Sequence, residues 1–162
     1  MRVSAIMTTT PAACSSKANL GTAIEMLWSR NCGMLPVVSD EGKVIGVVTD
    51  RDLCVALGTR NRLAGEISVG EIVSGKLFAC KPDDDVRVAL STMGREKVRR
   101  LAVINKEGRL EGVLSMDDVV THCEPRGFGK TPELSYEDVV DTLKKVYETQ
   151  FPVVMRGKVA VA

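Results

Sequence analysis

An internal duplication constrains the fold of this chain more than any other feature of its sequence. Residues 3–53 align with residues 69–119 at a constant offset of 66 without a gap, and 12 of the 51 aligned positions are identical. Chance would give about three identities at ordinary composition, so one structural unit occurs twice. A unit of about 50 residues buries too little surface to be stable alone, so the two copies are expected to pack together.

Both copies predict the same order of elements. In each copy Asn19 or Asp85 can cap a helix whose apolar residues recur with helical spacing. Two apolar runs follow, separated by a polar turn with a glycine, which predicts a β-hairpin, and a second amphipathic segment begins directly after it. The predicted helices are 20–28, 50–57, 86–93 and 116–122; the predicted strands are 34–38, 44–49, 101–104 and 110–115, with further strands within 8–14 and 74–80.

These elements predict an α/β (α+β) fold of two β-α-β-β-α repeats, packed pseudo-symmetrically sheet to sheet, plus a C-terminal helix. The first repeat is expected at 1–57, a linker at 58–68 and the second repeat at 69–124. Residues 125–162 are expected to form an irregular segment, a helix capped by Ser135 and a tail. This helix would pack on the pair's own surface or complete a dimer contact. A detachable helix that recognises another protein is the alternative.

Charge, hydropathy and cysteine usage narrow the possible functions. The chain has 22 basic and 21 acidic residues without a long run of either sign, which predicts neither a nucleic-acid partner nor a membrane contact. Five widely spaced cysteines fit buried hydrophobes in a reduced, cytoplasmic protein better than a redox or metal site. With one histidine, no nucleophile paired with a base and no phosphate loop, the chain is predicted not to be an enzyme.

A polar pair recurs where the second hairpin strand of each copy meets the next helix. The first copy reads Gly-Val-Val-Thr-Asp-Arg-Asp at 46–52, and the second reads Gly-Val-Leu-Ser-Met-Asp-Asp at 112–118. In one interpretation Thr49 with Asp52, and Ser115 with Asp118, only cap the helix that follows. In the other, each hydroxyl and carboxylate hydrogen-bond the two hydroxyls of a ribose. The spacing alone leaves both interpretations open.

The same motifs, with Leu-Pro-Val-Val at 35–38 and Leu-Ala-Val-Ile at 101–104, resemble those of CBS (cystathionine-β-synthase) domains. The span from about residue 3 to 123 resembles a tandem CBS pair, or Bateman pair, of the short stand-alone bacterial type. The resemblance implies a regulatory module that binds an adenine nucleotide (AMP, ADP or ATP) between the repeats, dimerises, and passes occupancy to an unidentified regulated protein by conformational change. A sensor of NAD(H) or S-adenosylmethionine, or a ligand-independent dimerisation or interaction module, is the alternative.

The resemblance also implies two nucleotide sites, each built by both repeats. The Asp52 site would contain Val47, Thr49, Asp52, Phe78, Ala79, Val98, Arg99 and Arg100. The Asp118 site would contain Val113, Ser115, Asp118, Pro11, Ala12, Cys32, Gly33 and Met34.

The two sites differ in charge, because Arg99 and Arg100 align with Gly33 and Met34. Guanidinium groups bind phosphates in two-pronged contacts, so the Asp52 site is expected to bind nucleotide more tightly. In the alternative, one arginine is solvated and the other joins a surface ion pair. An extra carboxylate at Asp117 would repel a triphosphate or attract a metal ion at the Asp118 site.

Overall fold

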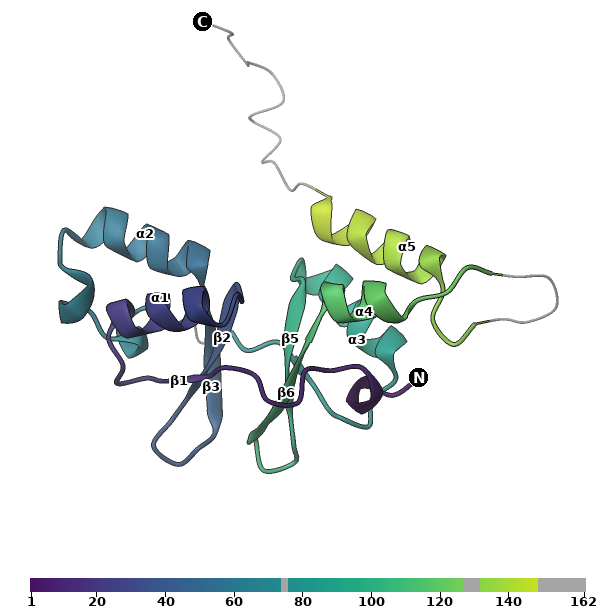
Figure 1. Cartoon of the computed structure of the whole chain (residues 1–162), viewed down its shortest axis with the longest axis horizontal. Coiled ribbons are helices and arrows are strands. Elements are labelled where there is room, and N and C mark those ends of the chain that lie inside the picture. Colours follow the sequence, from purple (N-terminus) through teal and green to yellow (C-terminus); the bar gives the residue numbers. More distant parts are fainter. Residues whose placement is uncertain (74–75, 127–131, 149–162) are drawn as a thin grey trace, which may run out of the picture.

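The computed structural model describes residues 1–73, 76–126 and 132–148 of the 162-residue chain. Each repeat forms a three-stranded sheet with two helices, and the two sheets lie side by side at the centre with the helices outside them (Figure 1). The predicted order of strand, helix, strand, strand, helix is confirmed in both repeats. The first repeat has β1 (Cys14–Ser15), α1 (Leu20–Ser29), β2 (Met34–Val38), β3 (Val44–Thr49) and α2 (Asp50–Arg60). The second has β4 (Ala79–Cys80), α3 (Val86–Glu96), β5 (Arg100–Ile104), β6 (Leu110–Ser115) and α4 (Met116–His122).

The two sheets have the same topology and register. In each sheet the first strand pairs parallel with the second, and the second pairs antiparallel with the third. The predicted hairpin turns contain Gly42 at φ 76° and Gly108 at φ 79°, a left-handed conformation that favours glycine. The predicted caps of the first helices also form: Asn19 accepts a hydrogen bond from the N–H of Thr22, and Asp85 accepts one from the N–H of Arg87.

The opening segments of the two repeats exchange places. The first chain segment forms the 3₁₀ turn η1 (Val3–Ala5), and its fully buried Val3 lies in the hydrophobic core of the second repeat. The linker contains the turn η2 (Ala64–Glu66), and the second repeat opens with the turn η3 (Val69–Glu71), whose Val69 is fully buried in the core of the first repeat. Each core is therefore completed by the opening segment of the other repeat, which ties the two repeats into one cooperative unit.

The C-terminal helix α5 (Tyr136–Tyr147) packs on α3 and α4 of the second repeat, one of the two positions expected for it (Figure 1). Leu134, just before it, and Val139 are buried in the second repeat's core. Its cap is the predicted Ser135, whose hydroxyl accepts a hydrogen bond from the N–H of Asp138 at 3.3 Å. Within the described part of the chain, the first repeat has no counterpart of α5. Residues 127–131 and the tail from 149 lie outside the described residues.

None of the helices in the described ranges is long and apolar enough to cross a membrane.

Candidate functional site

The two strand-to-helix corners have the same hydrogen bonds. At the first corner, the N–H and the hydroxyl of Thr49 donate to Oδ2 of Asp52 at 2.9 and 2.7 Å. At the second, the N–H and the hydroxyl of Ser115 donate to Oδ2 of Asp118 at 2.8 and 2.6 Å. Each carboxylate closes a capping box at the start of α2 or α4, so the helix-cap interpretation is confirmed.

Capping occupies only one oxygen of each carboxylate. The other oxygen of Asp118, Oδ1, accepts a long hydrogen bond of 3.5 Å from the hydroxyl of Thr8. Thr8 is held beside β6 by two backbone hydrogen bonds with Val113, both 3.0 Å long. An ionised carboxylate oxygen accepts more than one hydroxyl proton, so Oδ1 is suited to bind a ligand hydroxyl while Oδ2 caps the helix. The cap and the ligand interpretations are therefore compatible at this corner.

A cavity of about 440 Å³ opens in front of Asp118, between the two repeats. It brings together seven of the eight residues expected for the Asp118 site; the eighth, Gly33, lies just outside it. The seven are Pro11, Ala12, Cys32, Met34, Val113, Ser115 and Asp118. The side chains from the first repeat give an apolar wall, and the corner at Asp118 gives a polar one.

The cavity also contains residues that sequence reasoning missed. Thr8 and Thr10 come from the exchanged N-terminal segment, Arg30 from the end of α1, and Arg100 from the start of β5. Arg30 lies two residues after the end of the predicted helix 20–28 and its aligned partner is a glutamate, a charge difference that could have drawn attention to it. Nothing in the sequence around Thr8 indicates that it lies at this site, because its position depends on the exchange of segments between the repeats.

The residues expected at the Asp52 site come from both repeats. Phe78 and Val98 lie half-buried against the core of the second repeat, and Ala79 pairs with Ala102 in the sheet. Val47 lies half-buried in β3, beside the corner of Thr49 and Asp52. Residues 74 and 75, which align with Thr8 and its neighbour, lie outside the described residues.

Arg99 contacts α5, whereas Arg100 lies between the Asp118 cavity and Asp50 of the first corner. Nη1 of Arg99 donates a hydrogen bond to the Tyr147 hydroxyl of α5 at 3.4 Å, and this side chain is exposed. Nη2 of Arg100 lies 4.0 Å from a carboxylate oxygen of Asp117, in the Asp118 cavity. Successive residues at the start of β5 point to opposite sides, which separates the two guanidinium groups. This arrangement corresponds to the alternative considered from the sequence, with one exposed arginine and one in a surface ion pair.

The charges in the Asp118 cavity are balanced. Arg30 and Arg100 contribute two positive charges, while Asp117 and Asp118 contribute two negative ones. The side chain of Asp117 is largely exposed, so its ion pair with Arg100 is screened by water. Arg100 is thus available to an anionic group that enters the cavity. Among the described residues, no group of three or more histidine, cysteine or acidic side chains is placed to hold a metal ion.

Comparison with solved structures finds tandem domains of the same fold. The CBS domain protein PAE2072 from Pyrobaculum aerophilum, complexed with AMP, superposes with a TM-score of 0.65 at 25% identity, covering 74% of this chain and 90% of that one. The CBS domain pair of protein MJ0100, in complex with 5′-methylthioadenosine and S-adenosyl-L-methionine, superposes with a TM-score of 0.68 at 21% identity, covering 75% and 94%.

Comparison with curated sequences and family models agrees. The uncharacterized protein MK0525 of Methanopyrus kandleri is 26% identical over 102 residues, which are 61% of this chain and 52% of that protein. The chain spans about half the length of this relative and less of the next two, 36% and 21%. The model for the CBS domain matches residues 3–59 and again residues 69–124. With two matches that together cover more than half of its length, the chain belongs to the CBS domain family and contains a tandem pair of these domains.

Proposed function

We propose that this chain is a non-enzymatic regulatory module that binds an adenine nucleotide in the cavity at Asp118. The observation that carries the proposal is Oδ1 of Asp118, which has only a long hydrogen bond from Thr8 and faces a cavity that also contains two arginines and an apolar wall. A nucleotide needs these three features, because it combines ribose hydroxyls, an anionic phosphate and a flat apolar base.

The ribose is assigned to the corner of Ser115 and Asp118. One ribose hydroxyl would replace the Thr8 hydroxyl, whose bond to Oδ1 of Asp118 is already at the 3.5 Å limit of a hydrogen bond. The adenine would lie against Pro11, Ala12 and Val113, which line the same cavity. The AMP bound to PAE2072 and the adenosine derivatives bound to MJ0100 share the adenosine part, so they support this part of the assignment.

The balance of charges favours a ligand with one phosphate. Arg30 and Arg100 can neutralise a monophosphate, which carries about −1.5 to −2 charges at neutral pH. A triphosphate would bring further negative charge close to Asp117, which already shares Arg100. AMP is therefore proposed as the best-fitting nucleotide, ahead of ADP and ATP. S-adenosylmethionine and NAD(H) are the alternative ligands.

This proposal assigns the tighter site to Asp118, whereas the sequence placed it at Asp52. The change rests on Arg100, which lines the Asp118 cavity as well as the neighbouring groove beside Asp50. Signalling requires that the nucleotide bind two conformations of the pair with different affinities, because equal affinities would leave the equilibrium between the conformations unchanged. The regulated protein, or the second subunit of a homodimer, would respond to that shift.

Calorimetric titration with AMP, ADP, ATP, NAD and S-adenosylmethionine tests the proposal, together with thermal unfolding in the presence of each ligand. A ligand at 100 times its dissociation constant stabilises the folded protein by about 2.7 kcal/mol. We expect AMP to give the largest effect and ATP a smaller one. Mass spectrometry of the denatured, freshly purified protein would identify a ligand that co-purifies.

A ligand-independent interaction module is the second candidate. The completeness of both capping boxes favours it, because Thr49–Asp52 and Ser115–Asp118 satisfy their hydrogen bonds without any ligand. Absence of binding and of stabilisation with every adenine ligand would contradict the nucleotide proposal and leave this second candidate.

A further inference from the structure

The cavity at Asp118 continues into a larger groove. The groove has a volume of about 960 Å³ and lies between α1 and α2 of the first repeat. Asn31, Cys32 and Arg100 line both the cavity and the groove, so the two spaces share one junction. A ligand that fills the cavity and extends past these three residues enters the groove.

A short loop and one arginine form the junction. The N–H of Cys32 donates a hydrogen bond of 3.1 Å to the carbonyl oxygen of Leu27, which holds the loop against the end of α1. Gly33 follows without a side chain, and a Cβ atom on it would lie 3.4 Å from Nη1 of Arg100. The guanidinium group therefore lies beside this glycine, and an anionic group bound to it would lie where the cavity meets the groove.

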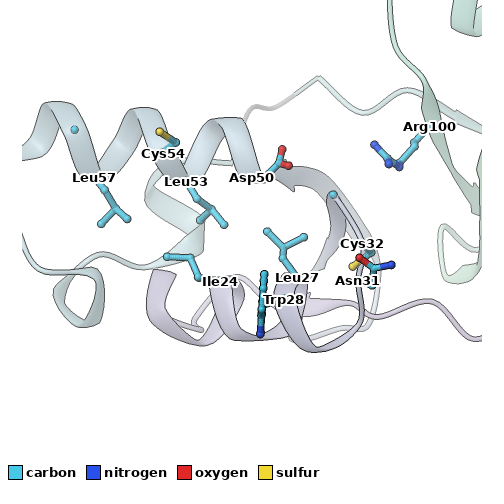
Figure 2. A pocket seen from close by; sticks show the side chains of 12 residues that line it. Ile24, Leu27, Trp28, Asn31, Cys32, Asp50, Leu53, Cys54, Leu57 and Arg100 are labelled. Carbon is cyan, nitrogen blue, oxygen red and sulfur yellow. The ribbon is translucent and has the colours of Figure 1, made fainter.

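Beyond the junction the groove is lined mainly by apolar side chains. Ile24, Leu27, Leu53 and Leu57 point into the space between the two helices, and Trp28 stands beside them (Figure 2). Trp28 is 87% exposed and Ile24 is 38% exposed, so this apolar surface is accessible to a ligand. An aromatic ring beside aliphatic side chains offers a large area for contact with an apolar chain.

The aligned face of the second repeat differs because α5 covers it. Helix α5 lies across α3 and α4, and Leu90, which aligns with Ile24, is only 3% exposed. A Cβ atom on Gly94, which aligns with Trp28, would lie 3.2 Å from Cβ of Lys145 in α5. The indole of Trp28 would therefore obstruct a helix at the same distance from the first repeat. The groove is better suited to a thinner occupant, such as an extended hydrocarbon chain.

The charges along this path end at the junction. Two of the described residues that line the groove carry a charge, Asp50 and Arg100, and both lie at one end of it (Figure 2). Oδ2 of Asp50 lies 3.5 Å from the position that a Cβ atom on Gly33 would take. This carboxylate would repel a second phosphate that followed the first past the junction. The groove therefore favours an uncharged, apolar extension of the ligand over a longer polyphosphate.

We infer that the ligand of this protein is an adenosine 5′-phosphate with an acyl chain on its phosphate, and that the acyl chain lies in the α1–α2 groove. The inference rests on the proposed binding of adenosine at Asp118. An acylated phosphate keeps a single negative charge, which the guanidinium of Arg100 can pair at the junction. Burial of each methylene group of the chain raises the affinity up to about fourfold.

The experiment compares stable acyl-sulfamoyl adenosine analogues that carry an acetyl, an octanoyl or a dodecanoyl chain. Calorimetric titration measures each affinity, and the emission of Trp28, the one tryptophan of the chain, reports on the groove. We expect the octanoyl analogue to bind at least about 60-fold more tightly than the acetyl analogue, since burial of about three methylene groups gives this gain. The emission should move to shorter wavelength with the two long-chain analogues only, and AMP should displace both.

Ile24→Glu and Val55→Glu form a matched pair of variants in the first repeat. Ile24 lines the groove, whereas Val55, an apolar residue of α2 that is 56% exposed, is not among the residues that line it. Glutamate is favourable in helices, so both variants should fold. Ile24→Glu should lose most of the gain in affinity that the octanoyl chain brings, because it places a charge in the groove. Val55→Glu should keep this gain.

Four results would overturn the inference. They are equal affinity for the acetyl and octanoyl analogues, a gain that survives in Ile24→Glu, an equal loss of the gain in Val55→Glu, and octanoyl binding that AMP does not displace. A second copy of the chain is the other candidate occupant of the groove. Tryptophan emission that shifts with protein concentration but not with the long-chain analogues would identify it and would also overturn the inference. Failure of both AMP and the acetyl analogue to bind would instead contradict the nucleotide proposal.

Discussion

Replacing Asp118 by asparagine separates the two tasks assigned to its carboxylate, and Asp52→Asn provides the matched control. Oδ2 of each aspartate caps a helix through the same two hydrogen bonds, whereas the other oxygen of Asp118 faces the cavity. The amide oxygen of asparagine can accept the same two hydrogen bonds from the N-cap residue, Thr49 or Ser115, so each variant retains its capping box. What Asp118→Asn removes is the negative charge, and the amide presents a donor where a ribose hydroxyl needs an acceptor.

The expected magnitudes follow from these contacts. A hydrogen bond to a charged group contributes about 1.5–3 kcal/mol, so Asp118→Asn should weaken AMP binding by about 10- to 150-fold. Loss of one negative charge in the first helical turn costs each variant about 0.3–1 kcal/mol of folding stability. For a protein of this size, that loss lowers the melting temperature by about 1–4 °C.

Calorimetric titration with AMP and thermal unfolding without ligand measure the two effects separately. Both variants should lose similar stability, and only Asp118→Asn should lose most of the AMP affinity. An equal or greater loss of affinity in Asp52→Asn would refute the assignment of the tighter site. Unchanged AMP binding in Asp118→Asn would refute the role of Asp118 in holding the ribose.

Three further predictions concern the fold. Met93→Ala, at a fully buried position in the second core, should lower the free energy of unfolding by about 2–5 kcal/mol in a chemical denaturation experiment. Burial raises the pKa of Cys80 to about 12, so a thiol reagent at neutral pH should modify the exposed Cys54 first. Peptide mass spectrometry measures the rate of labelling at each cysteine, and faster labelling of Cys80 than of Cys54 would contradict the prediction. The backbone N–H of Ser68, with a nearby arginine, lowers the pKa of Glu71 from 4.5 to about 2. Because the folded-state pKa is depressed, this stabilisation is present above pH 4.5 and is lost as the pH falls towards 2. Glu71→Gln should therefore be less stable than the wild type at neutral pH, with the difference shrinking across that window in thermal unfolding.

The sequence by itself determined the elements of this protein and their order. The offset of 66 residues predicted two equal units, and the hairpin glycines and helix caps appear where the pattern placed them. These features depend on residues within a few positions of one another, and backbone conformation and hydrogen bonding at that range follow from residue type. The paired hydroxyl and carboxylate at each corner could be found for the same reason. That the pair at Asp118 could also bind a ligand, through the carboxylate oxygen that does not cap the helix, was only one of two interpretations that the sequence allowed.

Tertiary structure alone decided which residues line the cavity at Asp118 and which helical face is covered. Thr8 reaches Asp118 because the N-terminal segment crosses to the second repeat, 110 residues away in sequence. Arg100 reaches the Asp118 cavity because its long side chain extends from the start of β5 towards Asp117, a direction that an alignment of the repeats does not contain. Helix α5 covers one repeat only, which exposes Trp28 on the other. Each of these outcomes depends on contacts between distant parts of the chain, whose energies are decided by packing and charge in three dimensions and leave no local pattern in the sequence.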